Sequence, residues 1–395
     1  MAAGSWPARY ASVRAHSQAL CAPLAVEDYV PQPMADVSPP KWHLGHTSWF
    51  FEAMVLQVHC ASYTAFHPHF AYLFNSYYEA LGERVQRIQR GALSRPTVAE
   101  VLAYRAHVDA AMLALLHSQP APAVLALTEL GLQHEQQHQE LLLADIKYIL
   151  GANPLHPSYD PRAQGPVDVA GEHARARASQ DGWISWPGGL CQIGHEGPGF
   201  AYDNESARHL AHVPALQLRA APVSNAEYAA FIADAGYQRH EFWQSEGWDW
   251  VRAEGIEAPL YWQRPAPDAP WQHYTLAGLQ PLPGHAPVSH VSYFEADAFC
   301  QWAGWRLPTE FEWEALAGQL DWGQRWEWTQ SAYLPYPGFR KAAGATGEYN
   351  GKFMVNQMVL RGASFATPQG HGRTTYRNFF HAPQRWQYTG LRPAR

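Results

Sequence analysis

The feature that most constrains the fold is a long stretch, 125–150, that contains no proline and a single glycine, Gly131. Its apolar residues recur at the spacing of one face of an α-helix. His134 and His138 are four residues apart, so on a helix they lie one turn apart on the same face, roughly 6 Å along the axis. Two imidazoles placed in this way can bind one metal ion, and neutral imidazole suits iron, zinc, copper and nickel. The alternative is a polar helix face with two solvated histidines.

The helix also shares a feature with the zinc hydrolases, because Glu135 directly follows His134. Such an enzyme needs a further downstream ligand, and Leu142 and Ala144 occupy the nearby positions, which argues against it. Uncharged hydrogen-bonding side chains surround the two histidines and suit a metal cleft that holds a substrate: Gln133, Gln136, Gln137 and Gln139.

Length and charge narrow the class of protein. A chain of 395 residues predicts two domains. The formal net charge is −7 and there is no basic run, which argues against nucleic acid as a partner and gives no reason to expect an anionic membrane surface. Neither a signal peptide nor an apolar stretch of about 18 residues is apparent, so we expect a soluble, cytoplasmic protein. Four widely spaced cysteines predict free thiols rather than a disulfide framework or a zinc site: Cys21, Cys60, Cys191 and Cys300.

The first part of the chain, 1–155, reads as all-helical. Ser38 is a plausible N-cap before prolines, and the helix that follows brings His43 and His46 onto one face. The natural architecture is a four-helix bundle with its site in the core. The helices are expected at about 5–26, 41–52, 69–82, 98–117 (capped by Thr97) and 125–150.

The sequence pattern changes after residue 155. Prolines, glycines and charges at 156–181 predict a linker. The remainder, 182–395, alternates short strand-like runs with turns and is dense in tryptophan, which indicates an α+β domain with much irregular structure. Only two clear helices are expected there, at 224–235 and 292–303, each opening with a serine cap.

These stretches together resemble a known family. Trp42-His43-Leu44-Gly45-His46 and the 134/138 helix resemble the DinB-like bundle of the sulfoxide synthases that make ergothioneine. The second half is similar to the formylglycine-generating-enzyme-like domain, a variant of the C-type-lectin fold. Its matching stretches include Val223-Ser224-Asn225, Arg306-Leu307-Pro308-Thr309-Glu310, Trp326-Glu327-Trp328-Thr329, Leu360-Arg361-Gly362 and Gly390-Leu391-Arg392.

The resemblance implies a mononuclear non-heme Fe(II), with O2 as co-substrate. The implied ligands are His46, His134 and His138, and His43 either supports a ligand or packs in the core. The implied reaction joins a chalcogen donor to imidazole C2 of hercynine (Nα-trimethylhistidine). Tyr77 or Tyr78 would manage protons, although two core aromatics are the alternative. On a helix only one of them faces the iron, and we favour Tyr77.

The resemblance also implies two small-molecule sites. Aromatic faces suit the quaternary ammonium of hercynine, and amides suit its carboxylate. The alternatives are core packing for the phenylalanines and a solvated charged run for the arginines. The implied acceptor residues are Gln137, Asn378, Phe379 and Phe380, and the implied donor residues are Arg87 and Arg90.

The departures from the family lie near the donor. Relatives usually carry prolines on both sides of the arginine that matches Arg87, whereas here Gln86 and Ile88 stand there. An altered donor loop beside an unaltered acceptor motif suggests the selenoneine synthase branch, in which a selenosugar is the donor. Cysteine follows closely as the alternative, and γ-glutamylcysteine is third. A different class also stays open: a non-catalytic binding module whose histidines hold a structural zinc.

Overall fold

The computed structural model describes residues 5–163, 182–341 and 345–395, and it forms two compact units. The first comprises Met1–Pro161 together with Ala366–His371, and the second comprises Arg162–Phe365 with Gly372–Arg395. The predicted linker at 156–181 lies outside the described residues from 164 onward. Among the described residues, no helix combines the length and apolarity that crossing a membrane requires.

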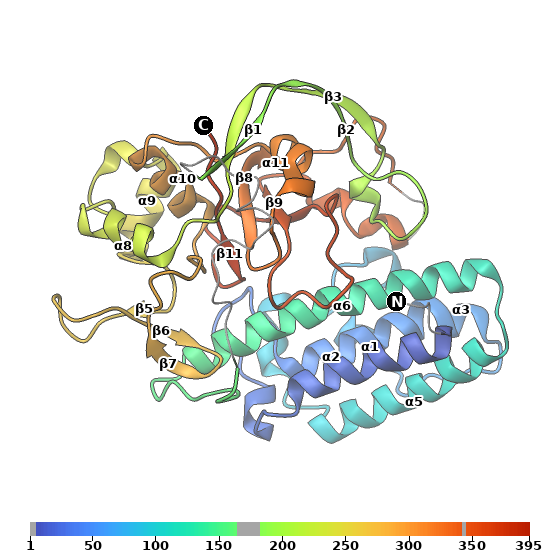
Figure 1. Ribbon diagram of the computed structural model, residues 1–395. Coiled ribbons are helices and arrows are strands. Elements are labelled where there is room, and N and C mark those ends of the chain that lie inside the picture. The colour runs from blue at the N-terminus through green and yellow to red at the C-terminus, as the bar shows by residue number, and fades with distance from the viewer. Residues whose placement is uncertain (1–4, 164–181, 342–344) are drawn as a thin grey trace. The chain divides into compact units, whose positions relative to one another are not determined.

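The first unit is built from four long helices that run side by side (Figure 1). They are α1 (Trp6–Cys21), α2 (Pro40–Phe51), α5 (Val98–His117) and α6 (Pro122–Gly151). Helices α1 and α2 each pack against both α5 and α6. The helical N-terminal domain predicted from the sequence is thereby confirmed. Shorter elements complete the unit: η1 (Val26–Tyr29), the π-helix η2 (Glu52–Leu56), α3 (Gln57–His59), α4 (Phe70–Phe74), η3 (Glu79–Leu81) and η4 (Arg87–Ala92).

Local signals explain where these helices begin. Helix α6 opens with a proline at its first position, where the missing N–H costs nothing, and it covers the whole stretch predicted from periodicity. Thr97 caps α5 as predicted, because its hydroxyl accepts a hydrogen bond from Glu100 N. Ser38 does not cap α2: the cap residue is Pro39, and the N–H of Ser38 instead donates to Asp145 Oδ2 at 2.8 Å.

The third predicted helix, 69–82, is wrong. Helix α4 ends at Phe74, after five residues. Asn75 ends it, because its side-chain amide donates to the carbonyls of Tyr78 and Gly82 at 3.1 and 3.2 Å. An asparagine that satisfies local carbonyls in this way stabilises a loop in place of a further helical turn.

The second unit is a sheet-containing domain, in agreement with the predicted α+β class. Its largest sheet has the order β10-β9-β8-β11, and a three-stranded sheet has the order β5-β6-β7. Two antiparallel pairs, β1-β4 and β2-β3, complete the strands. The strands are β1 (Trp183–Trp186), β2 (Gly189–Ile193), β3 (His209–Val213), β4 (Leu216–Arg219), β5 (Trp262–Gln263), β6 (Gln272–Thr275), β7 (Gly278–Pro281), β8 (Trp326–Ala332), β9 (Met358–Gly362), β10 (Asn378–Phe380) and β11 (Thr389–Gly390).

Among its described residues, the second unit contains two α-helices more than were expected. Helices α8 (Asn225–Ala233) and α10 (Tyr293–Trp302) carry the predicted serine caps. Helices α9 (Ser245–Glu254) and α11 (Glu310–Leu316) were not predicted from the sequence. Helix α11 has only seven residues, too few for a periodic pattern, although Thr309 and Glu312 form a capping box at its start. In 182–341 and 345–395 the structure also describes five 3-10 helices: η5 (Asp203–Glu205), η6 (His240–Phe242), η7 (Ala317–Gln319), η8 (Ala345–Glu348) and η9 (Gly351–Phe353).

The core of the second unit is locked by buried ion pairs. Arg392 reaches both carboxylate oxygens of Glu327 at 2.7 and 2.8 Å, and Trp313 Nε1 donates to the same carboxylate. Each of these three side chains is buried. Because buried charges are tolerated only when they are paired and hydrogen-bonded, these contacts fix β8 against the C-terminal segment and α11.

Candidate metal centre

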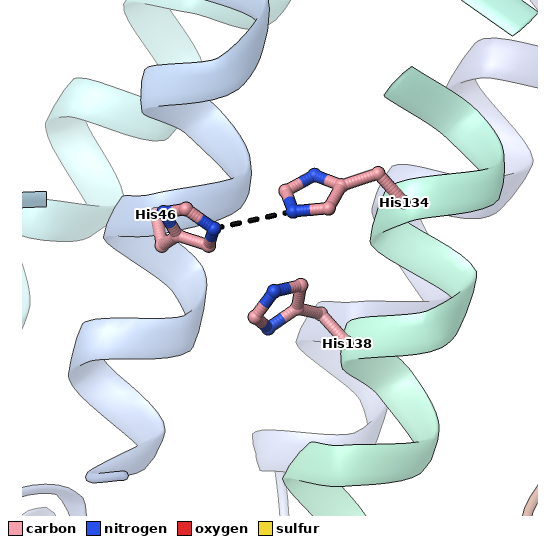
Figure 2. Close-up of side chains that lie close together, drawn as sticks. All are labelled: His46, His134 and His138. Atoms are coloured by element: carbon pink, nitrogen blue, oxygen red, sulfur yellow. Dashed lines mark hydrogen bonds between the residues drawn. The ribbon is translucent and has the colours of Figure 1, made fainter. Parts of the chain in front are cut away.

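Three imidazoles meet in the interior of the helical unit. His46 projects from α2, and His134 and His138 project from α6, one turn apart (Figure 2). One ring nitrogen of each lies within 4.8 Å of the other two. The closest pair is His46 Nε2 and His134 Nε2, at 3.2 Å. The structure therefore brings together the three residues that the sequence analysis selected as ligands.

Burial keeps these imidazoles neutral. His46 and His134 have no exposed surface. Burial lowers the pKa of His134 to about 3. It also lowers the pKa values of His46 and His138 well below the usual range, with neighbouring histidines adding to the effect. Neutral imidazole is the form that binds a metal ion, so the site has the donor chemistry that a metal requires.

Aromatic packing fixes the position of His46. Its ring is stacked on Trp42, with ring centroids 4.5 Å apart and an interplanar angle of 11°. Trp49 also stacks on it, at 5.4 Å and 15°. The Nδ1 atom lies 2.6 Å from the carbonyl oxygen of Phe74. These contacts hold the ring with Nε2 directed toward α6 (Figure 2).

Two glycines allow the surrounding elements to approach closely. A Cβ at Gly131 would lie 2.5 Å from the ring of Phe51, and one at Gly45 would lie 2.2 Å from the ring of Phe74. Either distance is shorter than any real contact. Close packing against α2 thus explains Gly131, the single glycine of the stretch 125–150, one turn before His134.

Glu135 does not face the histidines as a catalytic base would. Its Oε1 accepts from Ser17 Oγ at 2.6 Å, and its Oε2 accepts from Arg14 Nη1 at 2.9 Å. Arg105 Nη2 also donates to Oε1. Burial alone would raise the pKa of Glu135, but the guanidiniums of Arg105 and Arg14 lower it to about 2. The His-Glu pair therefore serves structure here, which removes the main argument for a zinc hydrolase.

His43 lies outside the group of three. Its Nδ1 is 2.9 Å from His138 Nδ1, and its Nε2 is 2.9 Å from Asp145 Oδ2. It therefore contacts a candidate ligand, as one of the two sequence interpretations allowed.

The two tyrosines lie in the irregular segment between α4 and η3. Tyr78 is fully buried, and its ring centroid is 5.4 Å from that of Trp49, which in turn stacks on His46. Tyr77 is half-buried and stacks on Tyr78 at 4.8 Å. The helical argument for choosing between them does not apply, because neither residue is on a helix.

The two arginines of the predicted donor site differ in exposure and in their bonding partners. Arg87 is half exposed, and its guanidinium is held by Asp36 through the backbone carbonyl and, at 3.8 Å, the carboxylate. Arg90 is buried, donates to Ser38 Oγ at 2.9 Å, and lies 3.4 Å from the ring centroid of Trp42. Burial lowers the pKa of Arg90, and Arg87 adds to this.

The segment that carries these arginines is held in place although the prolines usual in the family are absent. It forms η4, and Gln32 holds both of its ends. The side-chain amide of Gln32 donates to Arg87 O at 2.7 Å and accepts from Gly91 N at 2.6 Å. A side chain distant in sequence thus replaces the rigidity of the prolines.

The glutamines of α6 have separate roles. Gln137 is partly exposed beside His138. Gln139 is buried and donates to Val13 O and Ser17 Oγ, so it holds α1. Gln133 Oε1 lies 2.7 Å from His371 Nδ1.

His371 and its segment were missed by sequence reasoning. Although Ala366–His371 comes late in the chain, it belongs to the helical unit, and Thr367 donates to Glu140 at 2.5 Å. The Pro-Gln-Gly-His turn carries no pattern that predicts this location. Asp145 was also missed, since a single acidic residue in a long helix has no distinguishing signal.

Asn378, Phe379 and Phe380 form the edge strand β10 of the four-stranded sheet. All three are half-buried. Phe379 stacks on Tyr333 with centroids 4.0 Å apart, and Phe380 packs edge-on against Trp386 at 5.6 Å. The preceding residue, Arg377, anchors the strand through both oxygens of Glu310, at 2.8 and 2.9 Å. The strand is therefore a rigid element with partly accessible aromatic rings.

Comparisons with known proteins match both halves of the chain. Residues 9–142 match the DinB superfamily, and residues 169–322 match the sulfatase-modifying factor enzyme 1-like domain. This is the domain pair expected from the sequence motifs, in the same order.

Some named proteins are similar to this chain over most of its length. The hercynine oxygenase of Mycolicibacterium smegmatis is 29% identical over 344 residues, covering 74% of this chain and 77% of that protein. The hercynine oxygenase of Mycolicibacterium thermoresistibile is 28% identical over 358 residues, covering 78% and 77%. The formylglycine-generating enzyme of Thermomonospora curvata is 34% identical over 184 residues, covering 42% of this chain and 55% of that protein.

Proposed function

We propose that this chain, which joins a DinB-superfamily domain to a sulfatase-modifying-factor-like domain and is related to hercynine oxygenases, is an Fe(II)-dependent oxidoreductase that modifies hercynine. It would use O2 to form a carbon–chalcogen bond at C2 of the imidazole. One observation carries the proposal: three neutral imidazoles, of which His46 and His134 are buried and His138 is partly exposed, converge within 4.8 Å in the domain that these relatives share.

The donor set fits iron. His46, His134 and His138 would hold the ion, and three protein ligands leave half of an octahedral coordination sphere open for O2 and a soft donor atom. A bound Fe(II) would relay electrons from the two substrates to O2, which redox-inert zinc could not do. The rings of Trp42 and Trp49 cover both faces of His46, which has no exposed surface.

Hercynine carries a quaternary ammonium and a carboxylate. We assign the ammonium to the rings of Phe379 and Phe380, because aromatic faces attract such cations. We assign the carboxylate to the amides of Gln137 and Asn378. The half-buried aromatic rings of β10 and their anchoring through Arg377 support a preformed surface for this ligand.

For the proton step we propose Tyr77, with Tyr78 as the alternative. A phenol can deliver a proton to the reacting oxygen species only if substrate can reach its hydroxyl. Tyr77 is half-buried, whereas Tyr78 is fully buried against Trp49, and this difference favours Tyr77.

For the donor we propose a selenosugar, ahead of cysteine and of γ-glutamylcysteine. A sugar has no α-amino-acid carboxylate, so it does not need two free arginines. Arg87 is occupied by Asp36, and Arg90 is bonded to Ser38 and packed on Trp42, which supports a donor of this kind. Selenium is also easier to oxidise than sulfur and suits an ion with three neutral ligands.

A competition assay tests this proposal. The iron-loaded protein is given hercynine with equal concentrations of selenosugar and cysteine, and the products are identified by mass spectrometry. We expect at least a tenfold preference for the selenosugar, roughly 1.4 kcal/mol in transition-state binding. A predominant cysteine adduct would assign the protein to sulfoxide synthesis and leave the metal site as proposed.

A non-catalytic module with a structural zinc is the second candidate, since zinc also binds three imidazoles. Iron content and hercynine-dependent O2 consumption separate the two. Zinc in the isolated protein, together with no O2 uptake after iron loading, would favour the module.

A further inference from the structure

Two further polar side chains, His43 and Asp145, continue the hydrogen bonding from His138. His43, one turn before His46 on α2, has its Nδ1 atom 2.9 Å from His138 Nδ1. Its other nitrogen, Nε2, lies 2.9 Å from Asp145 Oδ2. Asp145 is on α6, two turns beyond His138, and both His43 and Asp145 are buried. The three side chains therefore form one hydrogen-bonded series, in which His43 of α2 lies between His138 and Asp145 of α6.

The donor and the acceptor of each hydrogen bond between Asp145, His43 and His138 can be assigned. Asp145 Oδ2 accepts from the backbone N–H of Ser38 at 2.8 Å, so this oxygen acts as an acceptor. His43 Nε2 must then carry a hydrogen to donate to it. A neutral imidazole has one N–H, so His43 Nδ1 is left with a lone pair and accepts.

The hydrogen bond to His43 determines the tautomer of His138. If His43 Nδ1 accepts, then His138 Nδ1 must carry the hydrogen between them. The other nitrogen of His138, Nε2, is left with its lone pair. His46 reaches the same state by a different route, because its Nδ1 donates to the carbonyl of Phe74, which cannot donate in return.

We propose that Asp145, acting through His43, is a positioning residue that holds His138 in the tautomer whose Nε2 can bind a metal ion. The inference rests on the proposed three-histidine site. Groups that orient a metal-binding imidazole in this way typically change metal affinity by 10- to 100-fold when they are removed. Ser38 supports the arrangement, since its N–H fixes Asp145 and its hydroxyl accepts from Arg90 at 2.9 Å.

Four variants of the full chain test the proposal. Asp145→Leu removes the oxygen that accepts from His43, so nothing holds the hydrogen of His43 on Nε2 and the hydrogen of His138 on Nδ1. His43→Leu removes the acceptor, whereas His43→Gln retains an oxygen that can accept from His138. Glu52→Gln is the matched control, because Glu52 is a buried carboxylate on the same bundle that is bonded to Tyr63, Phe66 and Tyr104 and not to the histidines.

Two readouts are needed, and neither uses hercynine or a donor. The first is the dissociation constant for Co(II), measured by competition with a chelating dye. The second is the tautomer of His138 in the metal-free protein, read from long-range proton–nitrogen NMR spectra, with the signal assigned by its loss in His138→Ala. Circular dichroism confirms that each variant is folded.

We expect the unmodified chain to show His138 with hydrogen on Nδ1. Asp145→Leu and His43→Leu should weaken Co(II) binding about 10- to 100-fold, with a changed His138 signal. His43→Gln should recover most of the affinity, and Glu52→Gln should match the unmodified chain. Wild-type affinity in Asp145→Leu and His43→Leu, or hydrogen on Nε2 in the unmodified chain, would overturn the inference. An unmodified chain with the expected tautomer that bound no Co(II) would instead overturn the proposed metal centre.

Discussion

Glu135 and Arg105 form an ion pair in which neither side chain is exposed to solvent. Together with Arg14 it joins α6 to α1 and α5 at the residue that follows His134. Removing one partner from such a group leaves uncompensated buried charge, which typically costs 3–5 kcal/mol. The pair thus links the stability of the bundle to the geometry of the site.

The first prediction concerns this pair. Glu135→Gln should lower the free energy of unfolding of the metal-free protein by about 3–5 kcal/mol, because the buried Arg105 loses its counterion and Arg14 retains only Asp109. Urea unfolding followed by circular dichroism measures the change. Glu129→Gln is the matched control on the same helix: its partner Arg9 is partly exposed, so the loss should be no more than about 1 kcal/mol. Equal losses in the two variants would contradict the argument.

The second prediction concerns metal loading. His46→Ala, His134→Ala and His138→Ala should each lose bound iron after anaerobic reconstitution, since each removes one of three ligands. Elemental analysis measures iron per chain. His117→Ala serves as the control, because His117 ends α5 and is exposed. Full iron content and turnover in any one of the three site variants would show that the ligand set is wrong.

The third prediction distinguishes the two tyrosines. Tyr77→Phe should lower kcat about 100-fold with little change in KM for hercynine, the effect typical of losing a proton donor. Tyr78→Phe should retain most activity, because its ring still packs against Trp49. The reverse result would move the proton step to Tyr78.

The fourth prediction concerns close packing of α6. Gly131→Ala would place a methyl group 2.5 Å from the ring of Phe51. The ring has to move, and overpacking of this kind costs about 1–3 kcal/mol. Gly318→Ala, where no atom lies within 4 Å, should change stability by less than about 0.5 kcal/mol. Thermal unfolding measures the stability of both variants. A Gly131→Ala protein as stable as the unmodified chain would show that α2 moves to accommodate the methyl group.

The fifth prediction concerns Arg87. Its guanidinium is half exposed and already bonded to Asp36. With a selenosugar donor, Arg87→Ala should change kcat/KM by about twofold at most, the scale of an exposed ion pair. Loss of more than tenfold, with KM for the donor rising, would indicate that Arg87 binds an acidic donor.

Much of the helical unit was predictable because it depends on local signals. The stretch around His134 and His138 contains no residue that breaks a helix, so its periodicity alone predicted α6 and the spacing of the two imidazoles. The cap at Thr97 and the serine caps of α8 and α10 were also readable, because a capping side chain acts within three residues.

Other features depend on residues that are distant in sequence, and only the tertiary structure decided them. The helix expected at 69–82 stops at Phe74 because Asn75 satisfies carbonyls of the following loop. Asp145 gains its role from the N–H of Ser38, 107 residues earlier, and His371 reaches Gln133 across 238 residues. The sequence by itself determined the helix that carries two imidazoles at one-turn spacing, because helical geometry is local. Which groups surround those imidazoles was decided by the packing of distant segments, because hydrogen bonds between them form only once the chain has folded.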